Sequence, residues 1–324
     1  MEFVRGLHNL KPEHRGCVAT MGNFDGVHLG HQQVLAQVRK QADGLGLPAV
    51  VVLFEPQPLE FVVGNAAPPR LTQLRDKLRL LAAYKMDQVV CLQFNHKLLH
   101  MQPQDLIHDL LLQGLSVQYF IVGDDFRFGY QRSGDFRLLQ WSGQKYGFQV
   151  TSTRTHLVNG VRASSTRIRE ALEQHDFSLV RQMLGRSFVI SGKVVKGQQL
   201  GRKMAAPTAN ICLPQARLAL QGVFATRIHG LAEGVKEGIA NIGYRPTVNG
   251  RQPQLEVHIF TLRDDLYGRY IGVEFCQFIR AEQRFNSLTE LQQQIRQDIA
   301  VAENYFVRCS NAPNINCNIE KASE

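Results

Sequence analysis

Short apolar runs alternate with longer helical stretches between residues 15 and 152. The expected strands are Cys17–Met21, Val50–Phe54, Val89–Leu92, Tyr119–Val122 and Gln149–Thr151. Stretches with helical periodicity, such as Leu71–Tyr84 and Gln104–Leu112, lie between them. This alternation is typical of a parallel sheet whose strands are joined by right-handed crossovers. Ligands of such sheets bind beyond the carboxyl ends of the strands, so we expect a site at that edge.

The pattern changes after Gly185, where short β-rich runs alternate with glycine-rich turns and little helix separates them. These runs are Phe188–Val195, Val223–Ile228, Gly238–Ile242, Leu255–Thr261 and Tyr270–Phe275. Several short strands joined by such turns favour an antiparallel barrel or sandwich. A final helix over about Leu288–Tyr305 carries apolar residues at a spacing of four and is expected to pack on those strands.

The fold class is therefore α/β followed by all-β. We expect a Rossmann-like α/β domain over residues 1–185, closed by two short helices within 165–184. An antiparallel β-barrel with a terminal helix is expected over residues 186–306. Residues 307–324 show no periodicity and are expected to form a disordered tail.

Composition excludes several classes of protein. The net charge is +9, but the basic residues are scattered, which favours small polyanionic ligands over nucleic acid. No apolar run approaches the roughly 18 residues of a membrane span, and Met1–Gly6 lacks the layout of a secretory signal. The six cysteines include no Cys-x-x-Cys pair. They are expected to be reduced thiols of a cytoplasmic protein, not disulfides or a zinc site.

The most informative segment for function is the glycine-rich turn of residues 21–31, between an expected strand and an expected helix. His28 and His31 share one face of the first helical turn. The unpaired N–H groups and the dipole of a helix N-terminus attract phosphate, and Gly30 leaves the backbone open to a ligand. On its own a His-x-Gly-His turn is usually accidental, but the glycines and polar residues upstream favour a phosphate site.

Three other segments carry polar or aromatic groups at the same edge of the expected sheet. Ser164–Arg167 precedes a helical run and is either an N-cap or a second phosphate contact. Val122–Gly129 brings two carboxylates and two aromatic rings to a strand end, where a purely structural turn is an equal alternative. Phe54–Pro58 offers a rigid wall and an aromatic ring for a flat ligand.

The second half contains two candidate segments, one from the glycine-rich turn to Asn210 and one around Glu256. Gly197 and Gly201 lie among cationic residues, as either a phosphate-binding turn or a hairpin with solvated lysines. Thr208 and Asn210 point to the same side of an extended stretch and offer the hard oxygen ligands that Mg²⁺ prefers. Glu256 lies on the opposite strand face from Leu255 and Val257; it is either a solvated residue or the base of a kinase that phosphorylates an alcohol.

The Gly22–His31 turn together with Ser164–Arg169 resembles the nucleotidylyltransferase superfamily, in its FAD synthetase branch. The resemblance implies that His28 and His31 hold ATP phosphates and act in catalysis. The ATP-binding residues that it implies for adenylyl transfer are Gly22, Phe24, His28, His31, Ser164, Thr166 and Arg167. The flavin-binding residues that it implies are Phe54, Pro56, Pro58, Asp125 and Phe128. Gln57 stands where many relatives have histidine.

Residues 1–306 as a whole resemble the bacterial bifunctional riboflavin kinase/FAD synthetases. The barrel motifs that carry this are Pro207–Asn210, Asn241–Thr247, Leu255–His258 and Asp265–Gly268. The resemblance implies that Glu256 is the base that activates the riboflavin hydroxyl and that Thr208 and Asn210 bind Mg²⁺. The kinase ATP-binding residues that it implies are Gly197, Gly201, Arg202, Thr208 and Asn210. Ala205–Ala206 departs from the glycine-containing pair of most relatives.

These implications predict a two-step enzyme that uses ATP and Mg²⁺ at both sites. Riboflavin is phosphorylated to FMN, and FMN is then adenylylated to FAD with release of pyrophosphate. Two alternatives remain open at this point: a single active module with the other kept for structure, and a regulator that binds flavin or nucleic acid. We expect a monomer or weak homo-oligomer, with riboflavin, FMN, FAD and ATP as its partners.

Overall fold

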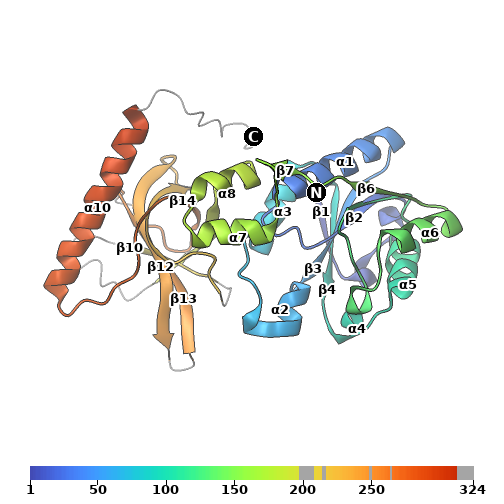
Figure 1. Ribbon diagram of the computed structural model, residues 1–324, viewed down its shortest axis with the longest axis horizontal. Helices are drawn as coiled ribbons and strands as arrows, with labels where there is room; N and C mark the ends of the chain where they lie inside the picture. Colours follow the sequence, from blue (N-terminus) through green and yellow to red (C-terminus); the bar gives the residue numbers. More distant parts are fainter. Residues whose placement is uncertain (197–207, 214–216, 248–249, 263–264, 312–324) are drawn as a thin grey trace. The chain divides into compact units, whose positions relative to one another are not determined.

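The computed structural model describes residues 1–196, 208–213, 217–247, 250–262 and 265–311. The chain divides into two compact units (Figure 1). The first comprises residues 1–68 and 72–165, and the second comprises residues 69–71 with the described residues from 166 onward. Within the described ranges, no helix is both long and apolar enough to cross a membrane.

The first unit is built on a six-stranded parallel sheet. The sequence predicts a parallel sheet and five of these strands, all but the first. Its strands are β1 (Glu2–Arg5), β2 (Val18–Met21), β3 (Ala49–Glu55), β4 (Gln88–Gln93), β5 (Tyr119–Gly123) and β6 (Gln149–Thr153). The strand order is β1-β4-β3-β2-β5-β6, and every neighbouring pair is parallel. The direction of winding reverses between β2 and β5, and this reversal opens a crevice for ligands at the carboxyl ends of those strands.

Helices cover both faces of this sheet. One core contains α1 (Leu29–Leu45) and α3 (Leu74–Ala83). The other contains α5 (Pro103–Leu106), the π-helical segment η4 (Ile107–Gly114) and α6 (Phe136–Tyr146). The smaller elements are α2 (Pro58–Val63), α4 (His96–Leu99), the hairpin β7 (Leu157–Val158) and β8 (Val161–Arg162), and the 3-10 helices η1 (Leu7–Asn9), η2 (Pro12–His14), η3 (Gly64–Ala66) and η5 (Tyr130–Arg132).

The second unit contains a closed six-stranded antiparallel barrel. Its strands are β9 (Val189–Val195), β10 (Thr208–Ile211), β11 (Gly222–His229), β12 (Lys236–Thr247), β13 (Gly250–Ile259) and β14 (Tyr270–Arg280). The order is β10-β13-β12-β11-β14-β9, and the pairing of β9 with β10 closes the barrel. The barrel predicted from the short β-rich runs is therefore confirmed.

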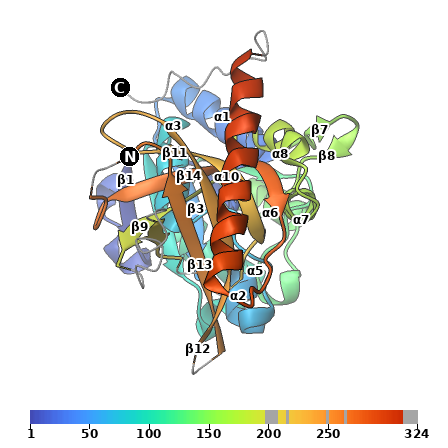
Figure 2. The same ribbon diagram turned by 90° about the vertical axis from the view of Figure 1, so that its left-hand side faces the viewer.

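The terminal helix α10 (Leu288–Asn311) lies along the outside of the barrel (Figure 2). Its buried Ala302 and Phe306 pack against Ala225 of β11. The Arg280 guanidinium donates to both oxygens of the buried Asp298 carboxylate, at 2.7–3.0 Å, which anchors the helix further. The helix continues to Asn311, five residues into the segment expected to be disordered; residues 312–324 lie outside the described part.

Helices α7 (Ser165–Glu173) and α8 (Phe177–Leu184) were expected to close the first domain, but their contacts assign residues 166–184 to the barrel unit. The reason is aromatic packing. The His175 ring, between the two helices, stacks on Phe278 at 3.8 Å and 7°. Phe177 meets Phe224 edge to face, with ring centroids 5.9 Å apart. Helical periodicity alone does not say which core such a pair of helices joins.

Candidate active sites

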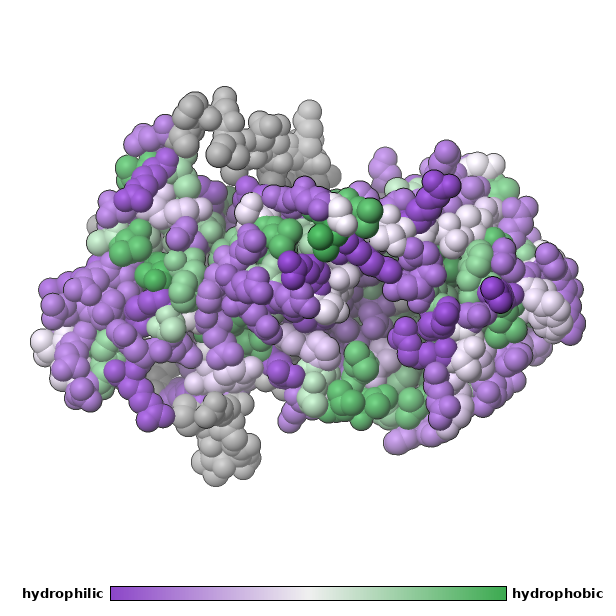
Figure 3. Space-filling model, in the orientation of Figure 1, coloured by the Kyte–Doolittle hydropathy of each residue, from purple (hydrophilic) through white to green (hydrophobic). Residues whose placement is uncertain are grey.

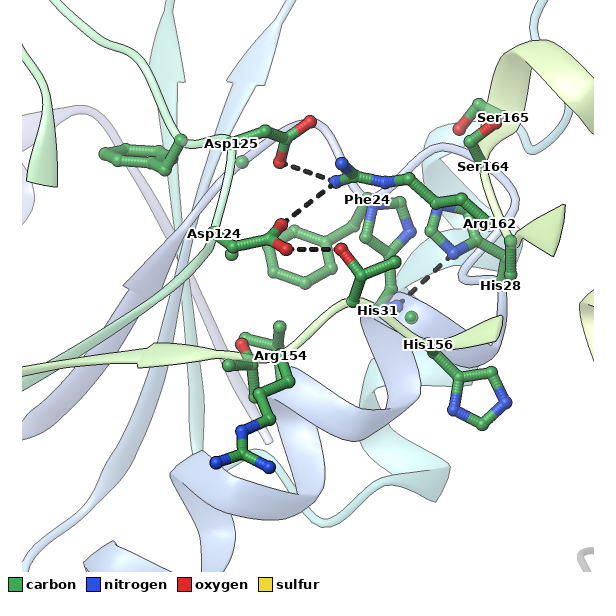
Figure 4. A pocket seen from close by; sticks show the side chains of 18 of the residues that line it. Phe24, His28, His31, Asp124, Asp125, Arg154, His156, Arg162, Ser164 and Ser165 are labelled. Carbon is green, nitrogen blue, oxygen red and sulfur yellow. Dashed lines mark hydrogen bonds and ion pairs between the residues drawn. The ribbon is translucent and has the colours of Figure 1, made fainter. Parts of the chain in front are cut away.

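The first site is a cavity of about 290 Å³ beyond the carboxyl ends of β2, β5 and β6 (Figure 4). Its walls come from segments far apart in the sequence. They are the turn after β2, the start of α1, the loop after β5, and the chain from β6 to Ser165. Its polar lining residues include His28, His31, Asp124, Asp125, Arg154, His156, Arg162, Ser164 and Ser165. The cavity is where the reversal of strand order predicts a ligand.

The two histidines of the turn form a pair at the N-terminus of α1. His28 is the N-cap residue, and its Nδ1 accepts a hydrogen bond from the backbone N–H of His31 at 3.4 Å. The two imidazole rings stack with centroids 3.7 Å apart, and the Phe24 ring packs on His31 at 4.9 Å. Gly30 leaves room for the His28 ring, because a Cβ there would lie 3.2 Å from two of its ring atoms, a tight contact. This packing fixes both rings at the cavity.

The turn itself is held by buried polar groups beneath it. The buried carboxylate of Asp25 accepts from the backbone N–H of Thr72 at 3.1 Å, and the Thr72 hydroxyl accepts from the N–H of Gly26 at 2.9 Å. The buried Lys77 ammonium donates to the carbonyl of Asn23 at 2.6 Å. Sequence reasoning did not identify Thr72 or Lys77, since each lies some fifty residues from the turn and carries no motif.

Arg162 joins two carboxylates in the lining of the cavity. Its Nη2 lies 3.3 Å from Asp124 Oδ1 and 2.7 Å from Asp125 Oδ1 (Figure 4). The Thr155 hydroxyl also donates to Asp124. Asp125 was expected to bind flavin and does line the cavity, whereas Arg162 was not foreseen. Ion pairs as exposed as these contribute only about 0.2–1 kcal/mol to stability, so their importance lies in the charge that they present to a ligand.

Only some of the residues expected to bind ATP for adenylyl transfer line this cavity. Gly22, Phe24 and Ser164 line the cavity with the histidines, and the Ser165 hydroxyl donates to the carbonyl of Asp25 at 2.8 Å. Thr166 and Arg167 belong to the second unit, where Arg167 pairs with Glu170 at 2.8 Å. The role of Thr166 and Arg167 in binding ATP stays a prediction.

The residues expected to bind flavin lie mostly outside this cavity. Phe54 is the second-last residue of β3 and meets Phe94 edge to face, with ring centroids 5.8 Å apart. Pro56 follows Glu55, the last residue of β3, and Pro58 begins α2 after the N-cap residue Gln57. Phe128 is buried in the core and stacks on Phe126, which lines the cavity instead.

Helix α2 exposes Leu59, Val62 and Val63, and Figure 3 shows apolar surface where α2 lies in Figure 1. Exposed apolar patches on a mostly polar surface mark binding sites more often than chance. Leu59, Val62 and Val63 therefore form an exposed apolar surface, here called the apolar ledge, next to the segment expected to contact flavin.

The second site is a row of polar side chains across three barrel strands. Asn210 on β10, Glu256 on β13 and Asn241 on β12 are direct partners in the antiparallel register, so their side chains share one face. Burial raises the pKa of Glu256, and the charge of Arg245 opposes that increase. Thr208 is paired with His258 one step along the same face. The expected metal ligands and base are thus neighbours.

Part of the expected kinase site falls on residues that the structure does not describe. Gly197, Gly201, Arg202 and the Ala205–Ala206 pair lie outside the described residues. Of the set predicted from the sequence, the structure places Thr208, Asn210 and Glu256. It adds Gln254, whose amide contacts both Asn210 and Glu256.

Comparison with known proteins identifies both units. Residues 10–167 match the family model described as FAD synthetase, and residues 184–306 match that of riboflavin kinase. The bifunctional riboflavin kinase/FMN adenylyltransferase of Escherichia coli K12 is 48% identical over 94% of this chain and 98% of its own. The chain belongs to the bifunctional riboflavin kinase/FMN adenylyltransferase family. The Pseudomonas fluorescens member is 47% identical over 93% of this chain and 97% of its own.

A solved structure shares the whole fold. It is described as a macrolide-efflux protein from Streptococcus pneumoniae, and it aligns with a TM-score of 0.77 over 94% of this chain and 99% of that chain. Its sequence identity is 23%, so the likeness concerns the fold and carries no functional argument. The two-unit architecture, a parallel α/β sheet followed by a closed barrel, therefore also occurs in a distant sequence.

Proposed function

We propose that the two activities of this family are performed at the two sites described above. The chain is a riboflavin kinase and an FMN adenylyltransferase. We assign FMN formation to the Asn210–Glu256 row of the barrel and FAD formation to the cavity at His28 and His31. The pairing of Asn210 with Glu256 in register supports the first assignment most strongly, because an amide oxygen of the kind that Mg²⁺ accepts then lies beside a half-buried carboxylate.

Adenylyl transfer at the cavity needs positioning and charge stabilisation more than a base. The nucleophile is a phosphate oxygen of FMN, which is already ionised at neutral pH. It attacks the α-phosphorus of ATP, and pyrophosphate leaves with the bonding electrons. His28 Nδ1 accepts a backbone N–H, which puts the hydrogen of the neutral ring on Nε2, where it can donate to a phosphate oxygen. The N-terminus of α1 adds positive potential.

Phosphoryl transfer in the barrel does need a proton acceptor. The ribityl hydroxyl of riboflavin attacks the γ-phosphorus of ATP, ADP leaves, and the hydroxyl proton passes to Glu256. A carboxylate whose pKa is raised by burial is a better acceptor than a fully solvated one. Thr208 and Asn210 offer neutral oxygens, which fit Mg²⁺ held mainly by nucleotide phosphates. When bound, this ion would neutralise phosphate charge.

The flavin ring of FMN is assigned to the apolar ledge of α2. Phe54, Pro56 and Pro58 form the rigid segment that leads into this helix, and Leu59 and Val62 expose apolar surface. A flat, largely apolar ring gains free energy by covering such surface. We further propose that the protein is a cytoplasmic monomer or weak homo-oligomer that does not bind nucleic acid, since its basic residues are scattered.

Purified protein given riboflavin, ATP and Mg²⁺ is expected to form FMN first and FAD after it, as resolved by liquid chromatography. Chelating Mg²⁺ with EDTA should abolish both products, because the phosphate charge at both sites is then uncompensated. FMN that accumulates without FAD would contradict an active first unit. FAD formed from added FMN, with no FMN formed from riboflavin, would contradict an active barrel.

Arg162→Ala is expected to raise the KM for ATP in FAD formation by about tenfold, because Asp124 and Asp125 then face the nucleotide phosphates without their counter-charge. FMN formation should be unchanged. Arg137→Ala, an exposed arginine on α6, is the matched control. Adding Asp124→Asn and Asp125→Asn should restore part of the affinity for ATP. An unchanged KM in Arg162→Ala would show that the ion pairs do not affect nucleotide binding.

A further inference from the structure

Gln254 has no role in the kinase site described so far, although it contacts two of its proposed residues. Its Nε2 donates to Glu256 Oε1 at 2.5 Å and to Asn210 Oδ1 at 3.0 Å. A single amide nitrogen carries two hydrogens, so both bonds can form at once. One side chain therefore links the proposed base of the kinase to a proposed ligand of its metal ion.

The barrel geometry explains why one amide reaches both groups. Gln254 and Glu256 are two residues apart on β13, so they lie on the same face. Asn210 is the direct partner of Glu256 on β10. The side chain at 254 is thus a diagonal neighbour of Asn210, within reach of a long side chain.

The other groups near Glu256 do not duplicate these bonds. Arg245 on β12 acts on it through charge. Asn241 faces it from the other side, but the Asn241 amide donates to Glu282 at 3.4 Å. Across the described residues, Gln254 is the side chain whose hydrogen bond fixes the Glu256 carboxylate.

We propose that Gln254 is a positioning residue of the kinase site. It holds Oε1 of Glu256, so that Oε2 is directed to the riboflavin hydroxyl, and it orients the carbonyl oxygen of Asn210 toward the phosphates. This proposal rests on the roles assigned above to Glu256 and Asn210. Hydrogen bonds that orient a general base or a metal ligand commonly control the rate without touching the substrate.

Two variants of similar size separate the hydrogen-bond donor of Gln254 from the space that its side chain fills. Gln254→Glu keeps the outline of the side chain but replaces its donor by an acceptor, and Gln254→Met keeps its length without polar atoms. Both are expected to lower kcat for FMN formation by about 10- to 100-fold. The dissociation constant of riboflavin, measured with ADP by quenching of flavin fluorescence, should stay unchanged. Gln277→Met on β14, a strand that does not pair with β10 or β13, is the matched control.

A double-mutant cycle gives the decisive comparison. Once Glu256→Gln has removed the carboxylate, adding Gln254→Met should cost less than about threefold more. A full additional loss in that background would show that Gln254 does not act through Glu256, and a kcat in Gln254→Met near that of Gln277→Met would show that it positions neither group. Either result would overturn the proposal. If Glu256→Gln alone keeps full kinase activity, the assignment of the base is wrong. If that variant is inactive while both Gln254 variants stay active, only the positioning role is wrong.

Discussion

Replacing Glu256 by alanine is expected to lower the turnover of riboflavin to FMN by about 10²–10⁴-fold. The attacking hydroxyl must lose its proton as the new phosphate ester forms, and the structure places this half-buried carboxylate beside Asn210. Conversion of added FMN to FAD should continue at its normal rate, because the cavity at His28 lies in the other unit. Product analysis with riboflavin or FMN as the starting flavin measures both steps.

The controls for this prediction address folding and charge. Glu303→Ala removes an exposed carboxylate from α10 in the same unit and should change neither activity. Glu256→Gln keeps the size of the side chain and should be nearly as inactive as Glu256→Ala, because an amide does not accept the proton. A Glu256→Ala enzyme that still forms FMN within about tenfold of the normal rate would rule out general base catalysis by this residue.

The parallel sheet was predictable because strands buried on both faces consist of nearly continuous apolar runs. β2 and β3 show this pattern and were located to within one residue at each end. β1 was missed because it is a four-residue edge strand, Glu2–Arg5, with a charged residue at each end. β10 has no apolar run either, so only its extended character was foreseen.

In the candidate sites too, some residues could be predicted from the sequence and others could not. Residues in contiguous motifs at strand or helix ends, such as His28, His31 and Asp125, were found from the sequence and line the cavity. Arg162 was missed because it lies on a two-residue strand, and its ion pairs are with carboxylates of a loop some forty residues earlier in the chain. Gln254 could have been found from the sequence, because it is two residues from Glu256 on the same strand and so shares its face. Only the structure shows that its amide reaches Asn210 as well.

Removing both histidines of the α1 turn is expected to have the opposite effect to Glu256→Ala. His28→Ala with His31→Ala should lower FAD formation from FMN by about 10²–10³-fold, the usual loss when donors to a developing charge are removed. FMN formation from riboflavin should be unaffected. The expected split follows from the position of the stacked rings at the cavity of the first unit, 3.7 Å apart.

One structural role of His28 must be separated from its chemical role. Its Nδ1 caps α1, and losing an N-cap costs about 1 kcal/mol of stability. His28→Asn with His31→Gln keeps a capping acceptor at position 28 and removes both imidazoles, so this pair should fold normally and still fail to make FAD. His108→Gln, an exposed histidine in the same unit, is the control. If the capped variant forms FAD at the normal rate while the alanine pair does not, the histidines shape the turn and do not stabilise charge during adenylyl transfer.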